Sequence, residues 1–438
     1  MGEKGGASHR SAPAYVLSME SNGLGVARTL GREGISVVGI DHRSWAPGLT
    51  SRYVRPLLCG DMSKEPKEVL RLLLEDVRHN GGRGVLFPAS DAAVMFMSRH
   101  RSELASGFDF LLPSENVEGA LTNKRLQHEE ALRLGIPVAE TFFPGSEDDM
   151  ARVIKGVHFP AFIKPLYSHL WFKRFGNKGI IVKNPEELRA RMAEVFETSL
   201  EVMVQSIILP PGEDLFSVGA YFGRNGYISP PFVWHKLRQY PPNFGVGSLA
   251  ESAHQPEVVE LAMKFMKGLG YQGIGYVEFK RDQRDGRWKM IEMNARTGAT
   301  NALQAEAGLP LVLFEYNDLT GGPRPSIVDY RDGVLWWDSM NDLDSYRRLR
   351  MRGQITLRQW VRSWFESEVY AYYAPDDMRP ALKRSNYGME LARLVGALLR
   401  NEADDDAMAE AVSPKGVLEE EGASLGLGQR NKAGRGAT

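Results

Sequence analysis

The sequence predicts an α/β protein that continues into α+β segments and ends in a mainly helical part. Near the N-terminus, short apolar strands alternate with helical stretches, which is typical of a parallel sheet. From about residue 116 onward, turn residues separate successive apolar strands, and this pattern favours antiparallel hairpins. Beyond Gly322-Pro323-Arg324-Pro325, stretches rich in arginine predict helices.

The N-terminal part begins with a β-loop-α-β unit. Strands are expected at 14–17, 35–40, 85–88 and 110–113, with helices at 24–34 and 91–99. A parallel sheet binds its ligand at the carboxyl ends of the strands. This edge holds Glu20, Asn22 and Asp91, which are candidate substrate contacts, although Asp91 would also serve as a cap for a helix that starts at Ala92.

The middle of the chain mixes helices and strands. A helix at 122–134 carries Lys124 in its first turn, and Lys164 lies at the end of an apolar strand at 159–165. Further strands are expected at 179–182, 202–205, 207–209, 216–222 and 227–236, with a helix at 185–196.

Changes in composition and in the expected helices and strands along the chain predict five segments. They are a parallel α/β domain at 12–115, a first α+β subdomain at 116–200, a second at 201–322, a mainly helical extension at 323–400 and a tail at 401–438. The extension is expected to hold helices at 343–362 and 381–400. Because the tail has few large apolar residues, we expect it to be disordered.

The composition is that of an ordinary globular protein, with 43% hydrophobic and 25% charged residues in 438. A formal net charge of −1 gives no general attraction to nucleic acid or to anionic membranes. Residues 1–11 show no apolar targeting stretch and no apolar run is long enough to span a membrane, so a cytoplasmic location is expected. Cys59 is the only cysteine, which excludes an intramolecular disulfide.

Two neighbouring apolar segments carry the most informative residues. Glu278 lies in one, Glu292 and Asn294 lie in the other, and turn residues at 282–286 between them predict a β-hairpin. Alternation places Glu292 and Asn294 on one face, and strand pairing can bring Glu278 alongside. Two carboxylates and an amide oxygen suit Mg²⁺, and Arg296 adds a cation for a phosphate group.

Other residues fit a nucleotide. Lys164 ends an apolar strand and needs a counter-charge, which a phosphate would supply, and Lys124 is a second candidate for the same role. The apolar segment Gln205-Ser206-Ile207-Ile208 can hold adenine through its backbone. Glu213 or Asp214, in the turn after it, can bind the ribose hydroxyls.

The order of these residues, followed by Lys236 and by Glu292-x-Asn294-x-Arg296, resembles the ATP-grasp superfamily. The resemblance runs from about residue 14 to residue 322, and the N-terminal part looks like the Rossmann-like pre-ATP-grasp domain. Within that superfamily, the segment at 235–242 and the arginine-rich extension resemble predicted carboxylate–amine ligases similar to D-aspartate ligase.

The resemblance implies an ATP-dependent ligase that joins a carboxylate to an amine through an acyl phosphate. Its cofactors would be ATP and Mg²⁺, with Mn²⁺ as the alternative ion. Its partners would be a small-molecule carboxylate and an amine, not nucleic acid, and a homodimer is one candidate assembly. The implied residues are Glu278, Glu292 and Asn294 for the metal; Lys124 and Lys164 for the phosphates; Gln205, Ser206, Ile207 and Ile208 for adenine; Glu213 or Asp214 for ribose; and Lys236 and Arg296 for the phosphoryl group and the acyl phosphate. A positive residue is also needed to hold the carboxylate that is activated, and Arg238 or Arg296 is the candidate.

Two alternatives belong to other classes of protein. A dinucleotide-binding oxidoreductase is suggested by Gly23 and Gly25 after a strand and by Asp41 at the end of the next strand, although Arg28 stands near the place of the third glycine. A nonenzymatic nucleotide-binding protein is the second alternative. The sequence also leaves open a thiol or hydroxyl acceptor in place of the amine.

Overall fold

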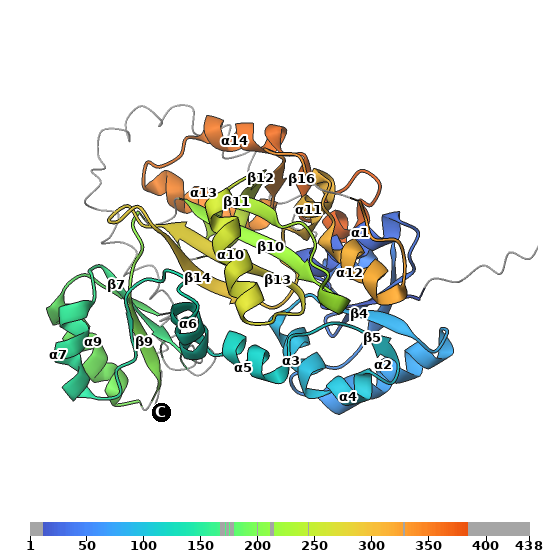
Figure 1. Cartoon of the computed structure of the whole chain (residues 1–438). Coiled ribbons are helices and arrows are strands. Elements are labelled where there is room, and N and C mark those ends of the chain that lie inside the picture. The colour runs from blue at the N-terminus through green and yellow to red at the C-terminus, as the bar shows by residue number, and fades with distance from the viewer. Residues whose placement is uncertain are drawn as a thin grey trace, which may run out of the picture. The chain divides into compact units, whose positions relative to one another are not determined.

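The computed structural model describes residues 12–166, 171, 175, 179–198, 200–210, 214–243, 245–326 and 329–383. The chain divides into two compact units. Among the described residues, the first comprises 12–121, 214–279 and 292–383, and the second comprises 122–210 and 280–291 (Figure 1). The five segments expected from the sequence stay a prediction.

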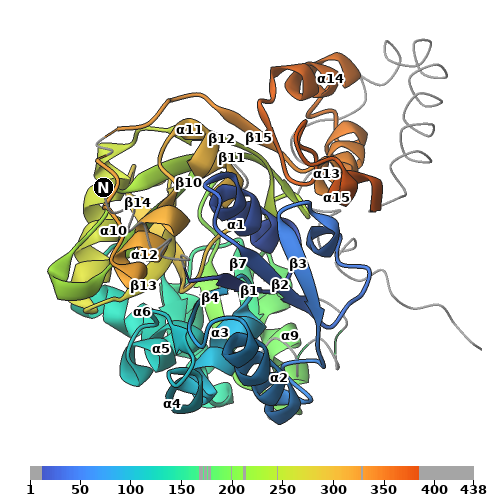
Figure 2. The ribbon, with the colours of Figure 1, turned by 90° about the vertical axis from the view of Figure 1, so that its right-hand side faces the viewer.

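A parallel sheet with the strand order β3-β2-β1-β4-β5 forms the N-terminal part of the first unit. Alternate residues of β1 point to opposite faces, so Ala14 and Val16 join the apolar cluster of α1, whereas Tyr15 and Leu17 join that of α2 and α3. Helix α1 therefore covers one face of the sheet, and α2 and α3 cover the other (Figure 2). The elements are β1 (Ala14–Leu17), α1 (Ser21–Arg32), β2 (Val37–Asp41), η1 (Pro47–Thr50), β3 (Val54–Leu58), α2 (Pro66–His79), β4 (Gly84–Pro88), α3 (Asp91–Arg99), α4 (Arg101–Leu104) and β5 (Phe108–Asp109).

The parallel sheet differs from the prediction at its two edges. Strand β3 was missed because it is an edge strand, where the exposed Arg55 and Pro56 interrupt the apolar pattern. Strand β5 ends before the predicted segment at 110–113. The carbonyls of Leu112 and Pro113 accept hydrogen bonds from the Arg101 side chain, so these residues are fixed by a side chain and not by a strand partner.

A larger sheet has the order β14-β13-β10-β11-β12-β15-β16, and the boundary between the two units passes through β13 and β14. Helices α11 and α12 share an apolar core with α1 and with β10 and β11 of this sheet. The elements are β10 (Leu215–Phe222), η3 (Arg224–Gly226), β11 (Phe232–Tyr240), β12 (Val246–Ala253), α10 (Pro256–Gly268), β13 (Gly273–Arg281), β14 (Trp288–Asn294), α11 (Asn301–Ala307) and α12 (Leu311–Thr320).

The C-terminal extension adds two strands to this sheet, which the prediction of a mainly helical extension did not include. Strand β15 (Leu335–Trp337) pairs antiparallel with β12, and β16 (Val369–Tyr370) pairs parallel with β15. The helix expected at 343–362 is two helices, because Gly353 adopts a φ of +66° and Thr356 begins a new helix with a capping box. The helices are α13 (Ser339–Met351), α14 (Leu357–Glu366) and α15 (Arg379–Lys383).

The second unit contains a four-stranded sheet with the order β6-β9-β7-β8. Helices α7 and α9 pack against one face of it, and their apolar residues cluster with those of β7 and β9 (Figure 1). Helix α6 begins after Asn123, whose side chain accepts hydrogen bonds from the first turn. The remaining elements of the chain are α5 (Glu115–Thr122), α6 (Lys124–Arg133), β6 (Thr141–Phe142), η2 (Glu147–Asp149), α7 (Met150–Gly156), β7 (Ala161–Pro165), β8 (Ile180–Val182), α9 (Pro185–Phe196) and β9 (Val202–Ser206).

Some predicted features lie outside the described residues. They are Glu213, the helix at 381–400 beyond Lys383, and the tail from residue 401. Within the described ranges, no helix combines the length and the apolar character that crossing a membrane requires.

Candidate active site

Glu278 on β13 and Lys236 on β11 form a nearly buried ion pair in the first unit. Lys236 Nζ donates to Glu278 Oε1 at 2.7 Å, and the two side chains are 11% and 9% exposed. Burial raises the pKa of Glu278, the Lys236 ammonium opposes this rise, and the negative charge of Glu292 adds to it. The structure thus brings together Lys236, Glu278 and Glu292, three of the predicted site residues.

Asn294 and Glu292 lie two residues apart on β14 and contact each other. Asn294 Nδ2 donates to Glu292 Oε1 at 3.2 Å. The side chains of Glu278, Glu292 and Asn294 fit a hard divalent cation, because a dication would relieve the repulsion between the two carboxylates and the cost of burying Glu278. Within the part of the chain that the structure describes, no three His, Cys, Asp or Glu side chains gather as a metal site. An ion here would therefore also need amide, water or phosphate oxygens.

Arg296 follows β14 and contacts the start of α3. Its guanidinium forms an ion pair with Asp91, whose side chain is 76% exposed, and its Nη1 donates to the Tyr276 hydroxyl at 3.3 Å. The alternative role of Asp91 as a helix cap is wrong. Helix α3 begins at Asp91 itself, and the Ser90 hydroxyl accepts the capping hydrogen bond from the Ala93 N–H at 3.2 Å.

Asn22 is a buried connection between segments of the first unit. Its Nδ2 donates to the carbonyls of Ala89 at 2.9 Å and Thr297 at 2.7 Å, and its Oδ1 accepts from Asn301 at 2.6 Å. This arrangement argues against the predicted substrate contact by Asn22, because its hydrogen-bonding groups are already used. Glu20 is more open, since its side chain is 33% exposed and pairs with Arg43 at 3.0 Å.

Arg238 lies on the opposite face of β11 from Lys236. Lys236 pairs with Ala250, and Arg238 pairs with Leu249, the next residue of β12, so a β-bulge separates them. Because paired residues share a face and neighbours in a strand do not, the bulge sends the two cations in opposite directions. Arg238 forms an ion pair with the buried Asp342, and this contact argues against a catalytic role for Arg238.

Lys124 and Lys164 lie close together in the second unit. Lys124 Nζ donates to the carbonyl of Pro165, the residue after Lys164, at 3.0 Å. Lys164 Nζ donates to Gln205 Oε1 at 2.9 Å, because β7 and β9 are paired neighbours. The structure therefore brings together these two lysines and Gln205.

Ser206, Ile207 and Ile208 follow one another where β9 ends. The N–H groups of Ser206 and Ile207 donate to the carbonyls of Glu140 at 2.9 Å and Pro160 at 3.0 Å. Within the described residues, the Ile208 N–H has no hydrogen-bond acceptor. It is thus the donor that this segment leaves available for a ligand.

A charged network that the sequence analysis missed fixes the Ile207 carbonyl. Arg284 Nη2 donates to this carbonyl at 3.0 Å, and the Arg284 guanidinium pairs with Asp282 at 2.7 Å. Asp282 has no exposed side-chain surface and also pairs with Lys289 at 2.8 Å. The available signal was Lys289 in an apolar strand, since a buried lysine needs a carboxylate near it.

Asp214 has a φ of +47°, so it occupies a left-handed turn position, and Glu213 lies outside the described residues. The choice between the two for the ribose stays a prediction.

The glycines that suggested a dinucleotide site are explained by packing. A Cβ on Gly23 would lie 1.9 Å from the Ser18 carbonyl oxygen, and one on Gly25 would lie 2.4 Å from Asn301 Oδ1. Arg28 pairs with Asp377 at 3.0 Å. The Asp41 carboxylate is 1% exposed and pairs with Arg43 at 2.9 Å, so it is not available to a ribose.

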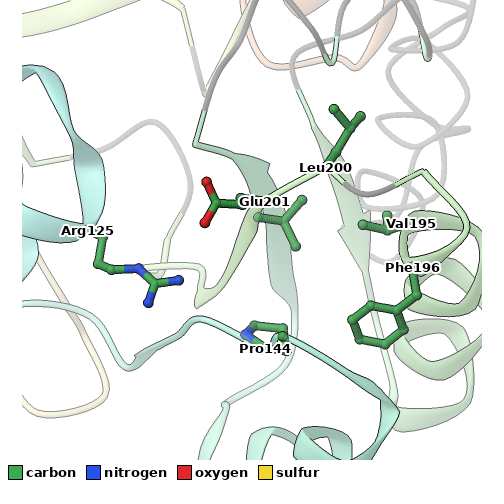
Figure 3. A pocket seen from close by; sticks show the side chains of 8 residues that line it. Arg125, Pro144, Val195, Phe196, Leu200 and Glu201 are labelled. Atoms are coloured by element: carbon green, nitrogen blue, oxygen red, sulfur yellow. The ribbon is translucent and has the colours of Figure 1, made fainter.

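A pocket of about 160 Å³ in the second unit contains none of the predicted site residues. Figure 3 shows the Arg125 guanidinium and the Glu201 carboxylate pointing toward one another across it, with Phe196 on a third side. Its full lining is Arg125, Pro144, Gly145, Val195, Phe196, Leu200, Glu201 and Val202.

Comparison with known protein families matches residues 248–317 to the carbamoyl-phosphate synthase L chain, ATP binding domain. This segment includes Glu278, Glu292, Asn294 and Arg296. Among curated proteins, a D-aspartate ligase from Enterococcus faecium (strain Aus0004) is 23% identical over 292 residues, which cover 62% of this chain and 68% of the relative.

Solved structures with the same fold include two further proteins. An L-amino acid ligase from Bacillus licheniformis matches with a TM-score of 0.52 and 14% identity, over 71% of this chain and 74% of that one. The biotin carboxylase domain of Hydrogenobacter thermophilus 2-oxoglutarate carboxylase, solved as a dimer with MgADP, ADP and bicarbonate, matches with a TM-score of 0.56 and 17% identity, over 75% of this chain and 74% of that one. At these identities the likeness shows the fold.

Proposed function

We propose, on the premise that this chain is a member of the ATP-grasp superfamily, that it is an ATP-dependent ligase which joins a carboxylate to an amine. The predicted fold class is confirmed, with a Rossmann-like pre-ATP-grasp part, an ATP-grasp fold and a C-terminal extension. The observation that carries the proposal is the group formed by Lys236, Glu278, Glu292 and Asn294.

Glu278, Glu292 and Asn294 would hold Mg²⁺, or Mn²⁺ as the alternative ion. Such an ion would neutralise the negative charge that develops on the phosphate oxygens. Lys236 lies beside this site through its contact with Glu278 and would stabilise the transferring phosphoryl group. The three carboxylates Glu278, Glu292 and Asp91 and the two cations Lys236 and Arg296 leave one net negative charge, which favours a metal ion.

The second unit would bind the nucleotide through residues of different kinds. Lys124 and Lys164 would contact the phosphates, because Lys124 Nζ lies on the carbonyl of the residue after Lys164 and an ammonium group forms charge-assisted hydrogen bonds with phosphate oxygens. The free Ile208 N–H would donate to adenine, and the Arg284 contact would keep the adjacent Ile207 carbonyl in place. Gln205 would orient Lys164, and Asp214 or Glu213 would bind the ribose.

The reaction has two steps. A carboxylate oxygen of the substrate attacks the γ-phosphorus of ATP, the bond to the bridging oxygen breaks, and ADP leaves. The ammonium group of the acceptor then gives one proton to the Asp91 or Glu20 carboxylate, the free amine nitrogen attacks the acyl carbon, the carbon–oxygen bond to phosphate breaks, and the second nitrogen proton leaves with the phosphate. Arg296 would bind the carboxylate or the acyl phosphate, whereas Asp91 and Glu20 would hold the ammonium group of the acceptor.

Amino acids are the first substrates to test, because two relatives are named as ligases of D-aspartate and of L-amino acids. Purified protein would be given ATP, Mg²⁺ and a panel of D- and L-amino acids and dicarboxylates, and ADP and phosphate would be measured. We expect ADP release that depends on substrate and stops with EDTA. Release of AMP and pyrophosphate, or reduction of a nicotinamide cofactor, would contradict the proposal.

A cytoplasmic location and a homodimer belong to the same proposal. The relevant measurements are cell fractionation for the location and light scattering on the purified chain for the assembly. A thiol or hydroxyl acceptor would show itself in the same ADP-release screen when such compounds replace the amines.

A further inference from the structure

Asp342, on α13 of the C-terminal extension, is a carboxylate with no exposed surface, and donors from four segments reach it. Arg238 on β11 donates to it from Nε at 2.8 Å and from Nη2 at 2.6 Å. Neutral donors complete its surroundings, namely Ser248 Oγ at 2.8 Å, Trp337 Nε1 at 2.8 Å and Trp360 Nε1 at 2.7 Å. Arg238 is therefore the cation that compensates this buried charge.

The extension holds Arg238 by a second contact. Arg238 Nη2 donates to Ser363 Oγ of α14 at 2.7 Å. The Ser345 hydroxyl of α13 donates to the carbonyl of Gln239, the residue after Arg238, at 2.9 Å. The side chain and the adjoining backbone of Arg238 are thus both fixed by the extension.

These contacts fall at the β-bulge that separates Lys236 from Arg238. Register shifts occur on both sides of Arg238, so regular pairing with β12 does not by itself define the strand there. A bulge aims side chains, and a change of register by one residue moves a side chain to the other face of a sheet. The direction of Lys236, and with it the 2.7 Å contact to Glu278, depends on how this bulge is held.

We propose that the C-terminal extension positions Lys236 for phosphoryl transfer, and that the buried Asp342–Arg238 pair is the contact through which it does so. Asp342 and Arg238 are then positioning residues. The extension supports the active site and does not touch the reacting atoms. The catalytic meaning of this inference rests on the proposed ligase function, whereas the placement of Lys236 can be measured without it.

The placement is tested by chemical labelling of the full chain. Asp342→Asn removes the charge that binds Arg238 and keeps the shape of the side chain. Acylation of Lys236 by a small amine-reactive anhydride, followed by mass spectrometry, should become about tenfold faster in this variant, with Lys289 as the internal reference. Unchanged labelling of Lys236 in a folded Asp342→Asn protein would overturn the proposal.

Asp377→Asn is the matched control. Asp377 is also a carboxylate of the extension with no exposed surface, and it accepts from Arg28, from the Ser51 hydroxyl at 2.7 Å and from the Arg52 N–H at 3.0 Å. It makes no contact with β11 among those described. Its loss should lower stability and leave Lys236 labelling within about twofold of wild type. Equal acceleration in both variants would mean general loosening and would also overturn the proposal.

A double-mutant cycle on kcat tests the catalytic consequence. Asp342→Asn should lower kcat about tenfold in the wild-type background and less than about twofold in a Lys236→Ala background, because its effect passes through Lys236. The same factor in both backgrounds would overturn the proposal. Absence of ADP release from wild type would instead count against the ligase function, and the labelling result would stand by itself.

Ser363→Ala is a milder variant if Asp342→Asn does not fold. It removes one hydrogen bond to Arg238 and leaves the ion pair with Asp342 intact. Lys236 labelling should rise by about two- to threefold, in the same direction as for Asp342→Asn. No change of labelling in this folded variant would also overturn the proposal.

Discussion

Glu278 and Glu292 carry like charges close to one another, and the burial of Glu278 makes this proximity costly. Such an arrangement persists in a protein when something positive compensates it. Lys236 supplies one positive charge to Glu278. A divalent cation would supply the rest, which is why we expect the metal to matter more for turnover than any single hydrogen bond.

Glu292→Gln and Asn294→Ala should each lower turnover by at least about a hundredfold, because each would remove or weaken a proposed ligand of the metal that acts in the transition state. The measurement is substrate-dependent ADP release at saturating Mg²⁺. Glu260→Gln, on the exposed side of α10, is the control for loss of a carboxylate. A folded Glu292→Ala protein with near wild-type activity would remove the metal assignment.

Asp91→Asn should raise the KM for the amine acceptor about tenfold and leave ATP binding intact. The reason is electrostatic, since the exposed Asp91 carboxylate pairs with Arg296 and would hold the acceptor's ammonium group. Because Ser90 and not Asp91 caps α3, the substitution keeps the helix cap, and loss of the largely exposed Asp91–Arg296 pair should lower stability only slightly. Ser90→Ala should instead cost about 1 kcal/mol of stability. An unchanged acceptor KM in Asp91→Asn would leave that residue without a role in binding.

Glu315 on α12 is a buried carboxyl group whose pKa is raised to about 8. Burial is the main cause, the negative charge of Asp318 adds to it, and a hydrogen bond from the Leu111 N–H opposes it. In the unfolded chain the pKa of Glu315 is 4.5, so between pH 4.5 and about pH 8 the folded chain keeps a proton that the unfolded chain has lost. The stability that protonated Glu315 contributes is fully present below its unfolded-state pKa of 4.5 and is lost as the pH rises through its folded-state pKa of about 8.

Glu315→Gln should remove this pH dependence, because the amide cannot lose a proton and still accepts from Leu111. Between about pH 5.5 and pH 7.5, wild type should lose roughly 2–3 kcal/mol of unfolding free energy relative to the variant. Urea denaturation at the two pH values measures the difference, with Glu260→Gln as an exposed control. Parallel losses in wild type and Glu315→Gln would show that Glu315 is ionised in the folded state.

At the scale of elements, α1 shows how packing can imitate a binding motif. Gly25→Ala should destabilise the first unit by about 1–3 kcal/mol, because a Cβ would lie 2.4 Å from Asn301 Oδ1. Gly119→Ala in α5 is the matched control, since nothing lies within 4 Å of its Cβ position. It should be neutral or should stabilise by up to about 1 kcal/mol. Thermal unfolding of the two variants checks the pair, and equal stability would refute the packing explanation.

Elements with a clear local signal could be predicted, and those fixed by distant contacts could not. The helix at 185–196 and the strand at 14–17 have the predicted bounds, because their apolar pattern and flanking residues define them locally. Strands β15 and β16 are short and gain their identity from pairing beside β12, which the sequence does not reveal. The element type of such segments is decided by tertiary contacts.

The same distinction between local signals and distant contacts applies to the residues of the candidate site. Glu292 and Asn294 share a face because side chains alternate along a strand, so their contact could be predicted. The separation of Arg238 from Lys236 could not, because a single extra residue in the bulge reverses the expected face. The use of Asn22 inside the core also depends on Thr297 and Asn301, which are far away in the sequence.

At the scale of the whole molecule, the predicted nucleotide and metal residues belong to two units of the chain. Lys124, Lys164 and Gln205 belong to the second, whereas Glu278, Glu292 and Asn294 belong to the first. A ligand that binds the folded chain stabilises it according to its concentration and affinity. The response of the chain to nucleotide and metal together is therefore a direct measure of the proposed binding.

ATP with Mg²⁺ should raise the thermal unfolding midpoint of the chain, because ligand at about 100 times its Kd adds about 2.7 kcal/mol to the folded state. EDTA should remove most of this shift, because the metal site proposed at Glu278 and Glu292 would then be empty. Lys164→Ala should reduce the shift, since a lost charge-assisted contact weakens ATP binding by roughly 1–3 kcal/mol. Lys183→Ala, an exposed lysine after β8, should keep it. A shift that is insensitive to both EDTA and Lys164→Ala would mean that ATP binds elsewhere on the chain.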